Sequence, residues 1–249
     1  MPTDRLEFAA RTDKGLFRTG NEDAVGVFPS SGLVVIADGI GGASAGEVAS
    51  SLAVQTVSEY FHGAITLPMD KEAAKLQAEE AVRVANLAIW ETSHATPEYA
   101  GMGTTLVVGY AREDWLVFAH VGDSRLYRLR DGDLLQLTRD HSLIQEVVDQ
   151  GFFPTLEHAQ RYGINENILT RGLGTADVVA VDSGEDELRP GDLYLFCTDG
   201  LSGMVTEGGI RRVLLGVNND LDRMSKALIK LACDGGGLDN ITVALMRVS

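Results

Sequence analysis

The segment Leu33-Val34-Val35-Ile36-Ala37-Asp38-Gly39 joins five apolar residues to an aspartate–glycine pair. A short apolar run rich in β-branched residues and bounded by a turn signal predicts a buried strand. An aspartate beside such an apolar run occurs at four places in the chain, at Asp38, Asp123, Asp199 and Asp239. Three predicted strands therefore end at an aspartate, and a fourth begins directly after one.

These four aspartates are expected to meet at one edge of a sheet. If the strand before Asp199 pairs antiparallel with the strand after Asp239, one strand ends where its partner begins. A single Asp-Gly pair is most often a turn. Several carboxylates packed together, however, repel one another unless a cation neutralises them. Oxygen ligands suit Mg²⁺, Mn²⁺ or Ca²⁺ rather than zinc, so the pattern indicates a site for such an ion.

The remaining pattern predicts an α+β fold. Apolar runs predict strands over Leu33–Ala37, Thr104–Tyr110, Trp115–Val121, Leu126–Arg130, Leu193–Cys197 and Ile241–Met246. Helical spacing of apolar residues predicts helices over Ala45–Phe61, Lys71–Thr92 and Leu221–Ala232, with weaker signals over Leu143–Val148 and Leu156–Tyr162. Turn signals at Glu113-Asp114 and Asp131-Gly132 indicate hairpins and therefore antiparallel pairing. Helices gathered in separate blocks would cover the sheet faces.

The whole chain has the composition of an ordinary globular protein. Its 249 residues include 36 acidic and 21 basic residues, for a net charge of −15. This balance disfavours nucleic acid and anionic membranes as partners, because both require basic patches. No linker or internal repeat interrupts the chain, so residues 1–249 are expected to form one domain. Two cysteines, no signal pattern and no apolar run of roughly 20 residues predict a cytoplasmic protein.

A further segment, Arg18-Thr19-Gly20-Asn21-Glu22-Asp23, places a guanidinium group five residues before a carboxylate. Taken alone, Arg18 is most simply interpreted as a solvated residue near a turn. Beside a metal cluster, the same side chain could form a bidentate bond to a phosphate.

Together these motifs resemble the PPM, or PP2C-type, Mg²⁺/Mn²⁺-dependent protein serine/threonine phosphatases, in particular their compact bacterial branch. The matching segments keep the family's order along most of the chain: Arg18–Asp23, Ala37–Gly42, Gly101–Thr105, Val121–Arg125, Thr198–Leu201 and Gly237–Val243. The resemblance implies a four-layer α-β-β-α sandwich, in which two antiparallel sheets pack face to face between helices. It also implies a flap inserted at about residues 138–174.

The resemblance gives each aspartate an expected role. Asp38 would bridge two metal ions, and the carbonyl group of Gly39 would complete one coordination shell. Asp199 and Asp239 would hold the other ion. Asp123 corresponds to the position that supports a third, weaker site in bacterial members. The expected cofactors are therefore two core Mn²⁺ or Mg²⁺ ions, with a further ion near Asp123.

The resemblance also implies the reaction and leaves its proton donor open. Asp23 would act as a ligand or orient metal-bound water, and Arg18 would bind the substrate phosphate. A hydroxide that bridges the metals would hydrolyse phosphoserine or phosphothreonine on proteins. Many eukaryotic members have a histidine as general acid where this chain has Ile40, which cannot donate a proton. The proton would then come from metal-bound water or another group; His120 and His141 are candidates, although a structural role is favoured for both.

Three functions are compatible with these motifs. An active protein phosphatase is favoured, because none of the core aspartates is missing. The alternatives are a catalytically silent regulator that binds phosphorylated proteins, and a hydrolase of a small phosphorylated compound. The family implies phosphorylated proteins as partners, namely a bacterial Ser/Thr kinase and its substrates. A compact catalytic domain without tails favours a monomer.

Overall fold

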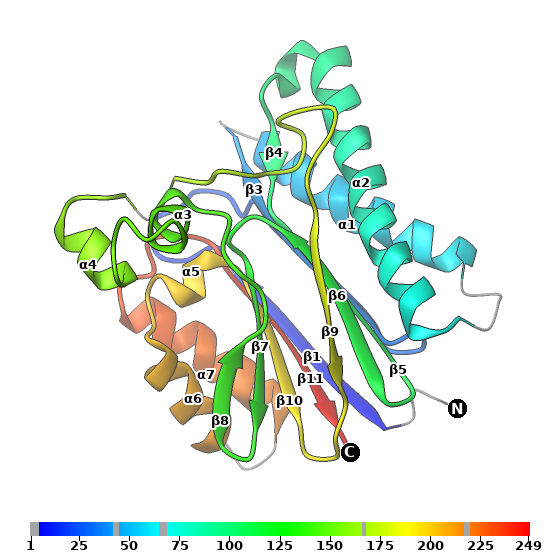
Figure 1. Cartoon of the computed structure of the whole chain (residues 1–249). Helices are drawn as coiled ribbons and strands as arrows, with labels where there is room; N and C mark the ends of the chain where they lie inside the picture. The colour runs from blue at the N-terminus through cyan, green and yellow to red at the C-terminus, as the bar shows by residue number, and fades with distance from the viewer. Residues whose placement is uncertain (1–4, 42–44, 65–68, 166–167, 217–219) are drawn as a thin grey trace.

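Two antiparallel β-sheets pack face to face in the protein, as Figure 1 shows. The structure is a computed structural model that describes residues 5–41, 45–64, 69–165, 168–216 and 220–249. Some predicted features lie outside this described part, namely residues 1–4 at the start of the chain, Gly42 of the motif Ala37–Gly42, and residues 166–167 of the flap.

The first sheet has five strands in the order β1-β11-β10-β7-β8. They are β1 (Leu6–Asp13), β7 (Arg125–Arg130), β8 (Asp133–Gln136), β10 (Leu193–Cys197) and β11 (Ile241–Val248). β1 pairs with β11 along its whole length, from Leu6 opposite Val248 to Asp13 opposite Ile241. Segments close to the two ends of the chain are therefore neighbours in one sheet.

The second sheet has the strand order β2-β3-β5-β6-β9, and a short strand, β4, pairs with the end of β3. Its members are β2 (Asp23–Phe28), β3 (Leu33–Ile40), β4 (Gly103–Thr104), β5 (Leu106–Arg112), β6 (Trp115–Val121) and β9 (Asp182–Glu187). The predicted hairpins β5–β6 and β7–β8 are confirmed. Glu113 and Asp131 take positive φ angles of 55° and 51° in their turns, a conformation that tight hairpins require.

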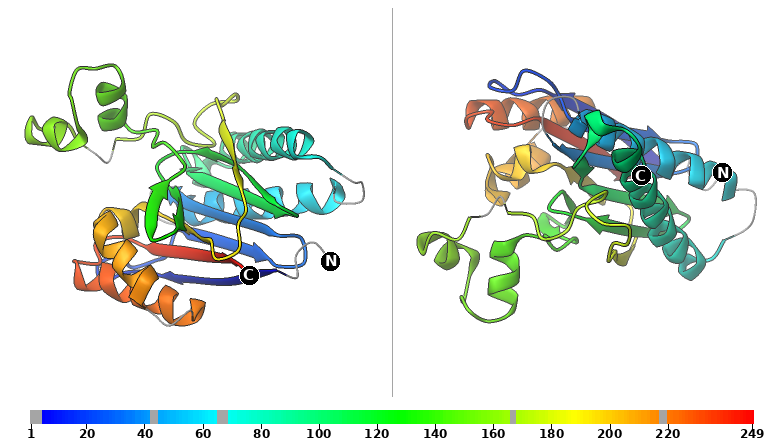
Figure 2. Two further views of the ribbon diagram at one scale, coloured as in Figure 1. Left: turned by 60° about the horizontal axis from the view of Figure 1, so that its bottom comes forward. Right: turned by 90° about the horizontal axis from the view of Figure 1, so that it is seen from above.

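Helices cover the outer face of each sheet, as the two views of Figure 2 show. Those on the second sheet are α1 (Ala45–Ala64) and α2 (Lys71–Ala95), with a 3₁₀ turn, η1 (Pro97–Tyr99), after them. Those on the first sheet are α5 (Asp199–Ser202), α6 (Glu207–Gly216) and α7 (Leu221–Asp234). The α+β, four-layer architecture is thereby confirmed. None of the described helices is long and apolar enough to cross a membrane.

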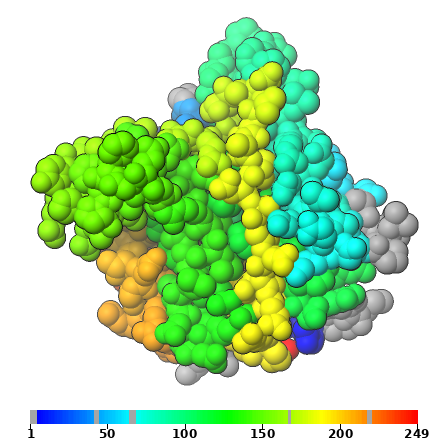
Figure 3. All heavy atoms as spheres, viewed as in Figure 1, coloured from blue at the N-terminus to red at the C-terminus, as the bar shows by residue number. Residues whose placement is uncertain are grey.

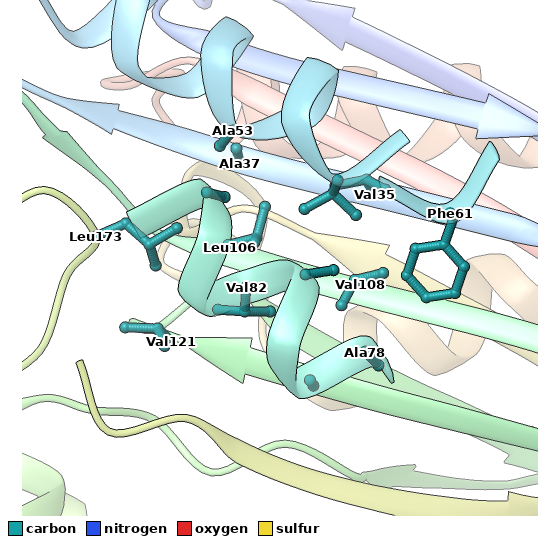
Figure 4. Close-up of a cluster of buried hydrophobic side chains, with 14 of the residues drawn as sticks. Val35, Ala37, Ala53, Phe61, Ala78, Val82, Leu106, Val108, Val121 and Leu173 are labelled. Carbon is teal, nitrogen blue, oxygen red and sulfur yellow. The ribbon is translucent and has the colours of Figure 1, made fainter. Parts of the chain in front are cut away.

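Three apolar layers hold the sandwich together. Figure 4 shows the layer between α1, α2 and the second sheet, where Phe61 and Val82 lie against strand residues such as Val108. Between the sheets, the Phe196 ring fills the space above Gly109, where a Cβ atom would lie only 2.5 Å from the ring. These side chains are fully buried. Burial of apolar area at about 25 cal/mol per Å² is the main stabilising contribution.

The predicted flap lies between β8 and β9 and contains two short helices, α3 (Leu143–Asp149) and α4 (Leu156–Arg161). Figure 3 shows it as the green lobe that protrudes from the sandwich. The hydroxyl groups of Ser142 and Thr155 cap the two helices. An isolated bridge between Ser142 and Leu169 joins the two ends of the flap, and another between Thr104 and Leu173 ties the flap to β4 of the sandwich.

Candidate metal centre

Strand pairing brings the predicted aspartates to one edge of the sandwich. β10 and β11 are antiparallel neighbours, so β10 ends at the edge where β11 begins. Asp199, just after β10, and Asp239, just before β11, therefore lie at the same edge. In the second sheet, Asp38 near the end of β3 lies opposite Asp23 at the start of β2. Asp123 follows the end of β6 at this edge.

A cavity of about 340 Å³ opens among these residues. Its wall contains five carboxyl groups, those of Glu22, Asp38, Asp123, Asp199 and Asp239. It also contains one guanidinium group, that of Arg18, together with Gly39, Ile40, Gly41, Thr105 and Leu169. All of the predicted site residues except Asp23 therefore line one cavity.

Burial and mutual repulsion raise the pKa of several of these carboxyl groups. Burial, and then the charges of Asp23 and Asp199, raise the pKa of Asp38 well above its ordinary value. Burial and the charge of Asp199 likewise raise the pKa of Asp123 to about 7. Asp38 and Asp199 are close enough to share a hydrogen bond, which requires that one of them be protonated. A bound divalent cation would relieve this repulsion.

Asp23 lies behind the cavity wall and is 9% exposed. Its Oδ2 accepts a hydrogen bond of 2.9 Å from the Thr198 hydroxyl group, and burial raises its pKa to about 7. The other oxygen, Oδ1, is buried without a hydrogen-bond partner, as is Oδ1 of Asp199. Buried, unpartnered carboxylate oxygens are costly. Such an all-oxygen donor set fits Mg²⁺ or Mn²⁺.

Arg18 is paired with one of the predicted metal ligands. Its Nη2 donates to Asp239 Oδ2 at 2.7 Å, and this bond is the main reason why the pKa of the guanidinium group is raised. The side chain of Arg18 is 53% exposed and also lines the cavity. The guanidinium group thus lies where the acidic wall meets solvent, a position suited to a phosphate.

Close backbone approach explains the glycine after Asp38. A Cβ atom on Gly39 would lie 2.3 Å from the carbonyl oxygen of Gly46 and 2.6 Å from that of Glu22. The Gly39 N–H donates to the same Glu22 carbonyl at 3.1 Å. The absence of a side chain thereby lets the first turn of α1 pack directly against the end of β3 at the cavity.

The two histidines considered as proton donors do not line the cavity. Their rings stack with centroids 4.8 Å apart. His141 Nδ1 accepts from the Gly122 N–H at 3.1 Å, and His120 Nε2 lies 2.9 Å from the Arg139 carbonyl oxygen. Burial lowers the pKa of both rings, to about 4 for His141, so both are neutral at pH 7. Their contacts support a structural role in bracing the loop before Asp123.

His120 and His141 also form, with Asp182, a group of three potential metal ligands whose donor atoms lie within 4.8 Å. However, Arg171 already pairs with Asp182 at 2.8 Å. The bond from the Gly122 N–H to His141 Nδ1 assigns the proton of the neutral ring to Nε2, the atom that faces Asp182. A positive neighbour and a protonated nitrogen both disfavour a cation, so the aspartate cavity is the better metal site.

The two cysteines are not suited to nucleophilic catalysis. Cys197 is fully buried, and burial raises its pKa to about 12. Burial also raises the pKa of the half-buried Cys233. Since the thiolate is the reactive form, neither sulfur is activated, and neither residue lines the cavity.

Three further residues support the site and were not singled out from the sequence. Glu22 lines the cavity, and burial raises its pKa. Asn240 accepts from the Glu22 N–H at 2.8 Å, and its amide group donates to two carbonyls of the loop 14–20. Thr105 Oγ1 accepts from the backbone N–H of Asp38 at 3.0 Å. Glu22 and Asn240 are sequence neighbours of predicted aspartates, and that adjacency was the available signal.

The flap contributes to the surroundings of Asp123. Leu169 of the flap lines the main cavity. A second cavity of about 210 Å³, between α3, α4 and α5, shares Asp123 and Asp199 with the first. In its wall, Arg125 holds Asp140 through a short contact of 2.6 Å. The flap therefore encloses the side of the site on which Asp123 lies.

Comparison with known proteins relates this chain to bacterial phosphatases. Residues 18–230 match the family described as protein phosphatase 2C. The chain is 39% identical to the serine/threonine protein phosphatase PstP of Mycobacterium tuberculosis over 246 residues. These aligned residues are 98% of this chain and 45% of that protein. It is 37% identical to the serine/threonine phosphatase stp of Listeria monocytogenes, over 95% of this chain and 94% of that protein.

A solved structure shows the same fold. The catalytic domain of serine/threonine protein phosphatase PstP, in complex with two manganese ions, superposes with a TM-score of 0.85 and 36% identity over 98% of each chain. The chain belongs to the protein phosphatase 2C family, as its motifs predicted. It spans less than half of the length of the mycobacterial relative.

Proposed function

We propose that this protein is a metal-dependent phosphatase that hydrolyses phosphoserine and phosphothreonine on proteins. The observation that carries the proposal is the convergence of five carboxyl groups and one guanidinium group on a single cavity. The raised pKa values of Asp38 and Asp123 support it. They indicate that the charges of these carboxyl groups are not neutralised by neighbouring side chains and would be stabilised by a bound cation. The named phosphatases among the relatives support it further.

The donor set fits two Mn²⁺ or Mg²⁺ ions. Asp38, with the Gly39 carbonyl group beside it, is the candidate bridge, because the charges of Asp23, Asp199 and Asp123 all act on it. Asp199 and Asp239 are candidates for one of the ions, and Asp123 for a third, weaker one. When bound, a pair of such ions lowers the pKa of water towards neutrality and neutralises charge on phosphoryl oxygens.

The protein's own groups would position the substrate. Arg18 presents a half-exposed guanidinium group at the cavity mouth, where it can bind phosphate oxygens in a bidentate manner. Asp239 shares that guanidinium group. A cation on Asp239 would replace the positive charge that Arg18 supplies, so that Arg18 could turn to the phosphate. Asp23, behind the wall and held by Thr198, would orient water or a ligand.

Ile40 lines the cavity but offers no proton. His120 and His141 are neutral and lie outside the wall. We therefore assign protonation of the leaving seryl or threonyl oxygen to water within the cavity rather than to either histidine. A catalytically silent regulator is disfavoured, because the four predicted metal-ligand carboxylates, Asp38, Asp123, Asp199 and Asp239, are all present around one cavity.

The test is phosphate release from a phosphothreonine peptide by the chelator-treated protein, with and without added Mn²⁺. The wild type should release phosphate only when Mn²⁺ is present, and Asp38→Ala should release little under either condition. Metal-independent release, or full activity of Asp38→Ala, would contradict the proposal. A panel of small phosphorylated compounds, assayed in parallel, separates a protein phosphatase from a hydrolase of small molecules.

The cellular setting is also a proposal. The pairing of β1 with β11 supports one catalytic domain built from the described chain. Two free thiols suit a reducing, cytoplasmic compartment. We propose a signalling role in which the enzyme removes the phosphate that a Ser/Thr kinase has placed on that kinase and on the kinase's substrates. We also propose that the enzyme acts as a monomer.

A further inference from the structure

Three large apolar side chains are exposed beside the proposed phosphate site. Leu16 is 65% exposed, Phe17 is 69% exposed and Leu238 is 55% exposed. Leu16 and Phe17 directly precede Arg18, and Leu238 directly precedes Asp239, the partner of Arg18. We call these three residues the apolar rim. Single exposed apolar residues need no explanation, but a group beside a site indicates binding.

The two loops that carry the apolar rim are joined by hydrogen bonds. The Leu16 N–H donates to the Gly237 carbonyl group at 2.8 Å. The Asn240 amide group donates to the carbonyl groups of Lys14 and Gly20, each at 2.9 Å. In the right-hand view of Figure 2, the blue loop after β1 lies beside the red helix α7. The loops are therefore held in place without burial of the rim side chains.

A surface that is fixed in place but left exposed is suited to a ligand. Since polar backbone contacts already define the loop 14–20, little ordering is required when a partner binds. We propose that the apolar rim binds an apolar side chain next to the phosphorylated residue of a protein substrate. This inference rests on the proposed phosphatase function and assigns its substrate class.

The geometry of an extended peptide agrees with this assignment. Successive residues of an extended chain advance by about 3.3–3.6 Å. Phe17 and Leu238 are the sequence neighbours of Arg18 and of its partner Asp239. With a phosphate at Arg18, we therefore expect side chains one to three residues away to reach them. The rim therefore adjoins the positions that flank the phosphorylated residue.

Charge narrows the substrate class further. The protein carries a net charge of −15, and five carboxyl groups line the cavity. Because bound ions would neutralise the cavity carboxyl groups, the negative net charge of the whole protein is the feature that repels phosphorylated segments with acidic neighbours. Sites flanked by leucine, phenylalanine or valine should therefore be preferred over sites flanked by aspartate or glutamate.

The test compares three phosphothreonine peptides that differ only in whether the flanking residues are apolar, serine or acidic. The Mn²⁺-loaded wild type should give the highest kcat/KM for the apolar peptide and the lowest for the acidic one. Phe17→Ser combined with Leu238→Ser should lower kcat/KM for the apolar peptide about tenfold, as expected when contact with one apolar side chain is lost. Hydrolysis of p-nitrophenyl phosphate, which has no flanking residues, should be unchanged.

Leu215→Ser is the matched control, because Leu215 is also 55% exposed but lies on α6. It should leave all three peptides unaffected. Leu238→Lys should raise kcat/KM for the acidic peptide and lower it for the apolar one. Equal rates for the three peptides in the wild type would overturn the inference while leaving the phosphatase proposal intact. An equal loss on all peptides and on p-nitrophenyl phosphate in the double variant would also overturn it.

Discussion

Replacing Asp23 with asparagine should stabilise the metal-free protein at neutral pH. Asp23 is 9% exposed, and burial raises its pKa from an ordinary 3.8 to about 7. Between these two pH values the folded protein binds more protons than the unfolded chain. The free energy of unfolding therefore falls as pH rises through this window, and the loss is complete above pH 7.

The size of the effect follows from the same shift. A displacement of about 3 pKa units corresponds to a penalty on the order of 4 kcal/mol above pH 7. In Asp23→Asn, the new amide group would keep the Thr198 contact through its oxygen, but its nitrogen would take the place of Oδ1, which has no partner. An unpartnered amide costs about 1–3 kcal/mol. The net gain at pH 7.5 should be roughly 2 kcal/mol, or about 6 °C in Tm.

Thermal unfolding of chelator-treated protein between pH 5 and pH 8 measures this gain. Near pH 5 the gain should vanish, because the penalty grows from zero near pH 3.8 and at pH 5 is only roughly 2 kcal/mol, about the cost of the unpartnered amide group. Asp131→Asn is the control, since Asp131 is exposed in a hairpin turn whose positive φ asparagine also tolerates. If Asp23→Asn lowered Tm equally at every pH, burial would not be destabilising the ionised form of Asp23, and this prediction would be wrong.

Other substitutions test individual parts of the site. Arg18→Ala should raise KM for a phosphopeptide about tenfold with a smaller change in kcat, because it removes a phosphate contact; an unchanged KM in steady-state assays would contradict this role. Ile40→His should retain turnover, and complete loss of phosphate release would show that proton supply is misassigned. Gly39→Ala should destabilise the protein by more than about 2 kcal/mol in urea unfolding, because its Cβ would lie 2.3 Å from the Gly46 carbonyl oxygen; a fully stable variant would show that this approach is not required.

The interior strands of both sheets could be predicted from the sequence, but the edge strands could not. The runs at Trp115–Val121 and Leu193–Cys197 were predicted with their observed bounds, because strands covered on both faces are continuously apolar. The missed strands β1, β2, β8 and β9 are all at sheet edges. β9, for example, reads Asp-Ser-Gly-Glu-Asp-Glu, since an edge strand that faces solvent has no need of an apolar run.

The part of the site that consists of aspartates at strand ends could be predicted from the sequence. An aspartate at the end of a buried strand marks a position at a sheet edge, so the meeting of Asp199 with Asp239 followed from antiparallel pairing alone. Asp38 belongs to the other sheet, and its approach to Asp199 depends on how the two sheets pack. The pairing of Arg18 with Asp239 could not be predicted, because it depends on how the Asn240 amide group holds the loop 14–20. Every residue type has a backbone carbonyl group, so the sequence does not show which carbonyl groups accept such hydrogen bonds.

The most direct test of the account is a Mn²⁺ titration of metal-free protein in which binding and phosphate release are followed in the same sample. We expect two tightly bound ions per chain, with turnover appearing as the second ion binds. Asp38→Ala, which lacks the candidate bridge, should bind fewer ions and release little phosphate. Full activity with one ion bound, or unchanged binding by Asp38→Ala, would contradict the claim that this carboxylate cluster is a two-metal phosphatase centre.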